Sequence, residues 1–188
     1  MKPLLVGMDI DGVIVDYVTA MLPLLSEICG RPVLYGDLIS SGLREALNMD
    51  EESVSYVFNQ LFDGGLLRHA PPVNGAIDGI QALGEHEIWL VTGRPVSAQS
   101  LTESWLQENN VGYARLVFTG RGDKLKAGPG FDVFVEDFIE EACILAEAGI
   151  FTLLLDQPWN QGPIPSENCR RVYDWNTIVL LINKFEKA

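Results

Sequence analysis

The feature that most constrains the fold is a short apolar run, residues 4–8, that ends in two closely spaced aspartates, Asp9 and Asp11. In an extended chain residues two apart point the same way, so both carboxylates should project together from the end of a buried strand. Such a pair repels itself unless a cation or hydrogen bonds compensate. It therefore indicates either a site for a hard divalent cation or a nucleophile paired with an acid/base, although a surface Asp-Gly turn at Gly12 is the simpler alternative.

Similar apolar runs recur along the chain and predict the strands of a parallel sheet. After residues 4–8 they cover residues 88–92, 116–119, 133–136 and 150–155. Helical spacing of apolar residues separates them, over residues 74–83 with Asn74 as the cap, 97–109, 138–148 and 174–185 with Asp174 as the cap. Alternating strands and helices predict an α/β fold, a Rossmann-like doubly wound parallel sheet. Ligands bind such sheets at the carboxyl ends of the strands, where Asp9, Asp11, Thr92 and Asp137 fall.

One long segment interrupts this alternation. Residues 17–73 contain no strand pattern and predict helices over residues 17–29, 37–47 and 51–62. Gly64-Gly65 and Pro71-Pro72 mark the return of the chain. We therefore expect a catalytic core of residues 1–16 and 74–188 with a small helical cap, residues 17–73, inserted after the first strand. The alternative is that these helices pack as part of one globule.

Composition limits the classes of partner. The 188 residues carry a formal net charge of −13, which argues against nucleic-acid polymers and anionic membranes but leaves small anionic substrates open. Three scattered cysteines (Cys29, Cys143, Cys169) suggest a reducing compartment. The N-terminal apolar run is too short for a signal peptide, and no stretch approaches 18 apolar residues, so we expect a cytoplasmic protein. The sequence does not decide between a monomer and a homodimer.

Four motifs in a fixed order resemble those of the haloacid dehalogenase (HAD) superfamily. They are Asp9-Ile10-Asp11-Gly12-Val13, Leu90-Val91-Thr92-Gly93-Arg94-Pro95, Lys124 and Val135-Glu136-Asp137. Within the superfamily the chain resembles the 5′(3′)-deoxyribonucleotidase branch and its bacterial relatives. This second resemblance rests on the stretches 11–16, 155–160 (Leu-Asp-Gln-Pro-Trp-Asn) and 171–175 (Arg-Val-Tyr-Asp-Trp).

The resemblance implies two catalytic carboxylates. Asp9 is the candidate nucleophile, which attacks phosphorus to form an aspartyl-phosphate. Asp11 is the candidate general acid, which protonates the leaving oxygen and later deprotonates water, a role that requires partial protonation near neutral pH.

The same resemblance implies binding groups for phosphate and metal. Thr92, Gly93 and Lys124 are the candidate phosphate contacts, with Lys126 as the alternative lysine because the sequence allows either register. Asp9, the main-chain carbonyl of Asp11 and the side chain of Asp137 are the candidate Mg²⁺ ligands. Glu136 is a weaker candidate for the metal site, because relatives usually carry Asp at its position. Arg94 could contact a phosphate or a cap residue, but it is also a weaker candidate, because most arginines of this kind are simply solvated. The deoxyribonucleotidases carry Thr-Ser where this chain has Thr-Gly-Arg-Pro, so the phosphate contacts can differ in detail.

These expectations favour a Mg²⁺-dependent phosphomonoesterase, and among those a 5′-nucleotidase acting on a nucleoside monophosphate. A phosphatase of sugar phosphates or other small metabolites is the first alternative. A catalytically inactive binding or regulatory protein is the second, against which the joint presence of Asp9, Asp11, Lys124 and Asp137 argues. Side chains that could contact a base are Tyr35, Arg44, Tyr56, Phe58, Phe62 and Trp159, although such aromatic residues more often pack in cores.

Overall fold

A six-stranded, all-parallel sheet forms the centre of the computed structural model, which describes residues 2–120, 122–164 and 166–186. Its strands are β1 (Leu5–Met8), β2 (Glu87–Thr92), β3 (Arg115–Phe118), β4 (Val133–Glu136), β5 (Phe151–Leu155) and β6 (Cys169–Val172). They lie in the order β3-β2-β1-β4-β5-β6, with Met8 of β1 opposite Leu90 of β2 and Val135 of β4. The order runs outward from β1 in both directions, which confirms the doubly wound fold.

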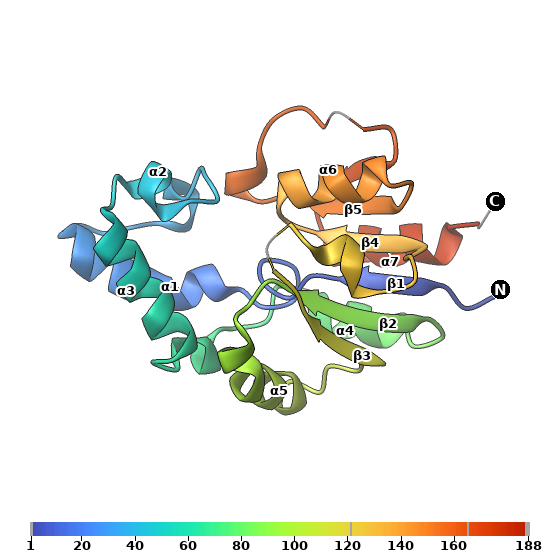
Figure 1. The fold of residues 1–188 in the computed structure, drawn as a ribbon, viewed down its shortest axis with the longest axis horizontal. Helices are drawn as coiled ribbons and strands as arrows, with labels where there is room; N and C mark the ends of the chain where they lie inside the picture. Colours follow the sequence, from blue (N-terminus) through green and yellow to red (C-terminus); the bar gives the residue numbers. More distant parts are fainter. Residues whose placement is uncertain (1, 121, 165, 187–188) are drawn as a thin grey trace.

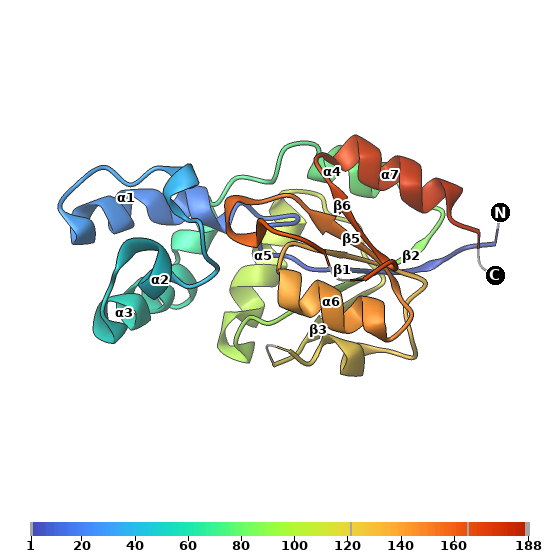
Figure 2. The same cartoon turned by 90° about the horizontal axis from the view of Figure 1, so that it is seen from above.

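Helices cover both faces of the sheet (Figures 1 and 2). α4 (Ala76–Ala82) and α7 (Trp175–Lys184) pack together on one face, and α6 (Ile139–Glu147) covers β4 and β5 on the other. α5 (Gln99–Glu108) connects β2 to β3. Because both faces are covered, the strands at the centre of the sheet are apolar along nearly their whole length.

The segment after β1 lies beyond the carboxyl ends of the strands, and the two termini lie at the opposite end (Figure 1). It contains α1 (Tyr17–Cys29), α2 (Leu43–Leu47), α3 (Glu51–Phe62) and the 3-10 turns η1 (Tyr35–Asp37) and η2 (Leu66–His69). The chain enters and leaves this segment side by side, because Asp16 N–H donates to the Pro71 carbonyl and Val73 N–H to the Ile14 carbonyl, at 2.9 and 2.8 Å.

Some predicted elements differ from the observed ones. The helix expected over residues 37–47 was wrong: only residues 43–47 are α-helical, because the chain bends at residues 40–42 and Gly42 is extended (φ −101°, ψ 124°) directly before α2. Asn74 does not cap α4, since Gly75 stands at that position in the left-handed region with φ 80°. β6 was not predicted. It is an edge strand in which Arg170 is exposed, so its sequence lacks an apolar run.

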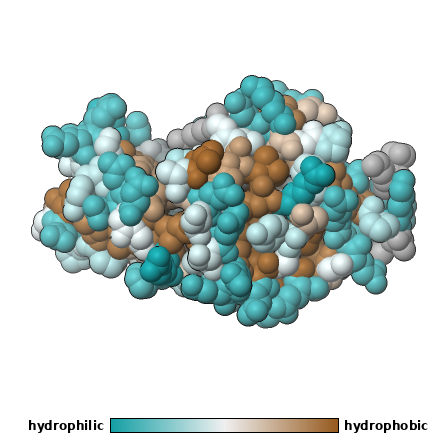
Figure 3. Space-filling model, turned by 60° about the horizontal axis from the view of Figure 1, so that its bottom comes forward, coloured by the Kyte–Doolittle hydropathy of each residue, from teal (hydrophilic) through white to brown (hydrophobic). Residues whose placement is uncertain are grey.

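A continuous cluster of buried side chains extends from the sheet into residues 17–73, the segment that is called the cap below. It joins Met8 and Leu90 of the sheet to Leu25 of α1 and Leu61 of α3. The face shown in Figure 3 intersperses apolar with hydrophilic residues, and the hydrophilic ones predominate along its outer edge. Within the described ranges, no helix has the length and apolar character needed to cross a membrane.

Candidate active site

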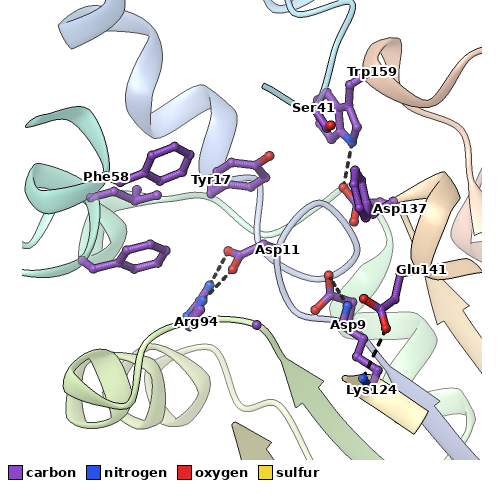
Figure 4. A pocket seen from close by; sticks show the side chains of 14 residues that line it. Asp9, Asp11, Tyr17, Ser41, Phe58, Arg94, Lys124, Asp137, Glu141 and Trp159 are labelled. Atoms are coloured by element: carbon purple, nitrogen blue, oxygen red, sulfur yellow. Dashed lines mark hydrogen bonds and ion pairs between the residues drawn. The ribbon is translucent and has the colours of Figure 1, made fainter. Parts of the chain in front are cut away.

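A cavity of about 210 Å³ opens at the carboxyl end of β1, where strand order diverges between β2 and β4. This is the position at which parallel α/β sheets bind ligands. Its lining, drawn in Figure 4, consists of Asp9, Asp11, Tyr17, Ser41, Phe58, Leu61, Phe62, Gly93, Arg94, Lys124, Asp137, Phe138, Glu141 and Trp159. Charged groups from the sheet therefore face apolar groups from the cap.

Lys124 is buried between two carboxylates at the base of the cavity. Its Nζ lies 3.0 Å from Asp9 Oδ2 and also contacts Glu136 Oε1. Burial alone would lower the pKa of Lys124, but the charges of Asp9 and Glu136 outweigh it and raise the pKa above that of a free lysine. Glu141 of α6 fixes the loop that carries this lysine, since its carboxylate accepts hydrogen bonds from the N–H groups of Gly122 and Lys124.

The carboxylates of Asp9, Glu136 and Asp137 are all buried and offer oxygen atoms within 4.8 Å of one another. Burial raises the pKa of Asp9 to about 7, although Lys124 opposes it, and burial and the Glu136 charge raise the pKa of Asp137 well above its ordinary value. One lysine thus leaves negative charge uncompensated, and oxygen ligands are those that Mg²⁺ prefers. The donor set fits a divalent cation.

The members of this cluster differ in how many oxygens are free for a cation. Glu136 Oε1 contacts Lys124, and its Oε2 accepts hydrogen bonds from the N–H groups of Asp137 and Phe138 at the start of α6. Both oxygens of Glu136 are therefore engaged. The Oδ1 atoms of Asp9 and Asp137 are not used by the contacts of Lys124 and Trp159, which involve Oδ2 in each case.

Asp11 points away from that cluster, toward Arg94 (Figure 4). Arg94 donates from Nε and a terminal nitrogen to both carboxylate oxygens, at 2.8 and 2.6 Å. The guanidinium is itself buried and donates a further bond of 2.9 Å to Thr102 Oγ1. Both carboxylate oxygens of Asp11 are therefore engaged by Arg94.

Both the backbone conformation and the surrounding atoms require a glycine at position 12. Its φ of +74° lies in the left-handed region, and a Cβ placed there would lie 2.0 Å from Asp137 Oδ2. The turn after Asp11 thus brings the backbone against the Asp137 carboxylate, which no other residue type permits.

The loop after β5 surrounds Asp137 from the other side. Trp159 Nε1 donates to Asp137 Oδ2 at 2.9 Å, and Asn160 Nδ2 donates to the Asp137 main-chain carbonyl at 2.7 Å. Gln157 Nε2 donates to the Gly12 carbonyl at 2.8 Å. Residues 157–160 thereby connect the loop after β1 with that after β4.

The structure brings together most of the candidates from the sequence. Asp9, Asp11, Gly93, Arg94, Lys124 and Asp137 all line the cavity. Thr92 is buried beneath it, where its Oγ1 accepts a hydrogen bond from Arg94 N–H. Lys126 is exposed and paired with Asp123, so Lys124 is the lysine at the site. Asp11 contributes no side-chain oxygen to the described carboxylate cluster.

The cap candidates separate into two groups. Phe58, Phe62 and Trp159 line the cavity, and Tyr35 packs on Trp159. Tyr56 is half-exposed along a different depression, and Arg44 forms an exposed ion pair with Glu51. Sequence reasoning missed Tyr17, Ser41 and Glu141; Tyr17 directly follows the Asp11–Asp16 motif, which is the only signal that could have marked it.

Comparison with known proteins identifies the family. The family model "5' nucleotidase, deoxy (Pyrimidine), cytosolic type C protein" matches residues 2–187. "Putative nucleotidase BH1399" of Halalkalibacterium halodurans is 25% identical over 185 residues, which cover 96% of this chain and 93% of that protein.

Solved structures share the fold at low sequence identity. The haloacid dehalogenase-like hydrolase SP0104 from Streptococcus pneumoniae aligns with TM-score 0.70 and 11% identity, covering 96% of this chain and 99% of that one. YfnB from Bacillus subtilis, a "putative HAD-hydrolase" bound to magnesium, aligns with TM-score 0.63 and 16% identity over 97% of this chain and 100% of that one. The chain therefore belongs to the 5′ nucleotidase, deoxy (pyrimidine), cytosolic type C family and is a phosphoric monoester hydrolase with the haloacid dehalogenase fold.

Proposed function

We propose that this hydrolase is a Mg²⁺-dependent 5′-nucleotidase that acts through an aspartyl-phosphate at Asp9. The observation that carries the proposal is the union of a buried Asp9–Lys124 pair with an apolar, cap-derived wall in one cavity. The Asp9–Lys124 pair suits a phosphoryl group. The apolar wall suits a flat, apolar portion of the substrate.

In the first step an Asp9 carboxylate oxygen bonds to phosphorus while the ester P–O bond breaks. The departing oxygen takes a proton from Asp11. For Asp11 to carry that proton, one of its contacts with the Arg94 guanidinium must open. Lys124 stays protonated throughout, because its two carboxylate neighbours hold its pKa high, and it balances the charge of the nucleophile and the phosphoryl oxygens.

In the second step water attacks phosphorus and the Asp9–phosphorus bond breaks. Asp11, now a carboxylate, takes the proton from this water and so returns to its acid form. Phosphate leaves, and Asp9 is regenerated as a free carboxylate.

Asp9 and Asp137 side chains and the Asp11 main-chain carbonyl are the proposed Mg²⁺ ligands. When bound, Mg²⁺ supplies positive charge that offsets the negative charge of the carboxylates and of the phosphoryl oxygens. Glu136, whose oxygens contact Lys124 and two backbone N–H groups, is assigned instead to fixing Lys124 and the start of α6.

The proposed substrate is a nucleoside monophosphate. Phe58 and Phe62 stack at 6.3 Å between ring centroids on the cap side of the cavity, and Tyr17 and Trp159 line other parts of it. Aromatic side chains can stack on any base, whereas a sugar phosphate offers them little. The nucleotidase name of the relative BH1399 supports the same class. Residues 17–73 are accordingly proposed as a substrate-selecting cap over a core of residues 1–16 and 74–188.

The deciding experiment compares kcat/KM for deoxynucleoside monophosphates with kcat/KM for sugar phosphates of similar leaving-group pKa. A nucleotidase should favour nucleotides by at least about tenfold, roughly 1.4 kcal/mol of transition-state binding. An equal or reversed preference would remove the nucleotidase assignment and leave the hydrolase. Asp9→Asn, which keeps the shape of the side chain, should abolish turnover on every substrate while the protein remains folded.

A further inference from the structure

Trp159 connects the cap to a proposed metal ligand. Its indole N–H donates to Asp137 Oδ2 at 2.9 Å, and its ring packs against two cap residues. The Tyr17 ring meets it edge-on at 6.1 Å and the Tyr35 ring is tilted against it at 5.8 Å. Figure 4 shows the indole above Asp137, pointing its N–H toward the carboxylate.

The backbone around Trp159 is fixed independently of this contact. Asn160 donates to the carbonyls of Asp137 and Leu155, and Arg171 of β6 donates to the side-chain and main-chain oxygens of Asn160. Gln157 bonds to the Gly12 carbonyl and accepts a hydrogen bond of 3.0 Å from the Tyr35 hydroxyl. The loop is therefore held on one side by the sheet and on the other by the cap.

Asp137 is a side chain that needs such support. It is buried beside the carboxylates of Asp9 and Glu136, with oxygen atoms of all three within 4.8 Å of one another. Apart from the indole, its Oδ2 atom faces the turn at Gly12, where a Cβ would lie 2.0 Å away. A donor that engages Oδ2 fixes the rotation of the carboxylate and leaves Oδ1 for another partner. Groups that orient metal ligands in this way typically change metal affinity by about 10–100-fold when removed.

We propose that Trp159 is a positioning residue that orients Asp137 for Mg²⁺, and that the cap maintains this orientation through Tyr17 and Tyr35. Seating of the cap and occupancy of the metal site are then coupled: a displaced cap loosens Trp159 and weakens metal binding, and bound metal favours the seated cap. The inference rests on the proposed function in one respect, the assignment of Asp137 as a Mg²⁺ ligand.

Trp159→Phe tests the hydrogen bond, because it retains an aromatic ring and removes the N–H. Trp89→Phe is the matched control: Trp89 is similarly buried, and its Nε1 also donates to a carboxylate, Glu87 Oε1, at 2.8 Å, but it lies in the sheet outside the cavity lining. Titration calorimetry with Mg²⁺ alone should show at least about tenfold weaker binding in Trp159→Phe and wild-type binding in Trp89→Phe. Equal Mg²⁺ affinity in Trp159→Phe and wild type would overturn the inference.

Activity separates orientation of the ligand from general damage to the site. In Trp159→Phe the Mg²⁺ concentration for half-maximal turnover should rise by the same factor, and turnover should recover at saturating Mg²⁺. A loss of kcat that no Mg²⁺ concentration restores would contradict a positioning role. Tyr35→Ala should weaken Mg²⁺ binding severalfold while the exposed cap control Tyr56→Ala does not; unchanged affinity in Tyr35→Ala would remove the coupling to the cap.

A measurement on the native sequence covers the case in which Trp159→Phe does not fold. The chain has four tryptophans, so ¹⁵N labelling gives four indole N–H signals to follow during a Mg²⁺ titration. The signal of Trp159 should shift most, and that of Trp89 should stay nearly fixed. An unmoved Trp159 signal at saturating Mg²⁺ would overturn the inference even if the wild type binds metal and hydrolyses nucleotides. Absence of any Mg²⁺ binding by the wild type would instead remove the proposed metal site itself.

Discussion

Asp9, Asp11 and Asp137 are one residue type in three environments, and their contacts separate their proposed roles. Asp9 faces Lys124, Asp137 faces an indole N–H, and Asp11 faces a guanidinium. The Asp11–Arg94 pair is bidentate, so the guanidinium fixes the plane of the carboxylate. Arg94 thus orients the proposed acid and must also release it for protonation.

Arg94→Gln should therefore slow the reaction according to the leaving group. With alkyl phosphates, which need a proton on the departing oxygen, we expect kcat to fall by about 10–100-fold, part of what general acid catalysis contributes. With an aryl phosphate whose leaving group needs no proton, the loss in the first step should be much smaller. Steady-state kinetics on both substrates tests this, with Arg44→Gln as the control because Arg44 is exposed on the cap. Equal losses on both substrates would contradict the assignment of Arg94 to Asp11.

Gly12→Ala should disable the site for two reasons. The new Cβ would clash with the Asp137 carboxylate, and alanine disfavours the positive φ at this position. Gly30→Ala is the control: Gly30 also has a positive φ, +63°, but no described heavy atom other than those of its two chain neighbours lies within 4 Å of its Cβ position. Both variants should lose about 1–2 kcal/mol of unfolding free energy from backbone strain, and Gly12→Ala more. Only Gly12→Ala should lose Mg²⁺ binding and turnover, as measured by calorimetry and phosphate release. Retained Mg²⁺ binding in Gly12→Ala would mean that Asp137 can move aside without consequence.

At this scale the sequence predicted the charged residues at strand ends, because their positions follow directly from the parallel sheet. It could not predict Glu141 or the contact of Trp159 with Asp137. Glu141 belongs to a helix, where its face depends on packing, and its partners Gly122 and Lys124 lie in a separate loop. Trp159 reaches Asp137 across 22 residues of chain, and nothing local specifies that contact.

The elements themselves were predictable where local signals agree. α1 and α3 begin and end where the sequence placed them, and each is capped by an aspartate, Asp16 or Asp50, that accepts from a backbone N–H. The prediction of one helix over residues 37–47 was wrong because its helical pattern includes Ser40, Ser41 and Gly42. These residue types favour bends and turns, and α2 begins only after them. β6 was not predicted because it is an edge strand, and an edge strand does not need the apolar run that marks the central strands.

α3 gives a prediction for substrate selection, because its faces differ. Phe58 and Phe62 face the cavity, whereas Tyr56 lies half-exposed on another side of the same helix. Phe58→Ala should lower kcat/KM for nucleoside monophosphates by about tenfold, the value of one stacking contact, and leave a small aryl phosphate nearly unaffected. Tyr56→Ala should change neither. Equal losses on both substrates in Phe58→Ala would indicate damage to the cavity and not lost contact with a base.

For the whole molecule, electrostatic repulsion lowers the stability of the folded state and apolar burial raises it. The chain carries a net charge of −13 and buries three carboxylates around one lysine, so folding concentrates negative charge. Yet the apolar cluster extends without a break from the sheet into the cap, and it supplies stability to both. We therefore expect the metal-free protein to fold as a unit, with the carboxylate cluster as a local source of instability.

Mg²⁺ should accordingly raise the melting temperature by more than its ionic strength explains. A ligand at about 100 times its dissociation constant adds roughly 2.7 kcal/mol to the unfolding free energy. For a chain of this length that corresponds to about 5–10 °C. Because a net charge of −13 is also screened by salt, the reference is NaCl of equal ionic strength with a chelator.

The variant Asp137→Asn tests whether this rise in melting temperature comes from Mg²⁺ bound at the proposed site. The raised pKa of Asp137 means that its ionised form is less stable in the folded than in the unfolded chain at neutral pH, so a neutral residue should not destabilise the metal-free protein. Asp137→Asn should thus melt at or above the wild-type temperature in chelator and gain little from Mg²⁺. Thermal melts of both proteins in chelator, NaCl and MgCl₂ give the comparison. If Asp137→Asn gained as much from Mg²⁺ as the wild type, the ion would be acting elsewhere on the acidic surface and not at the carboxylates between β1 and β4.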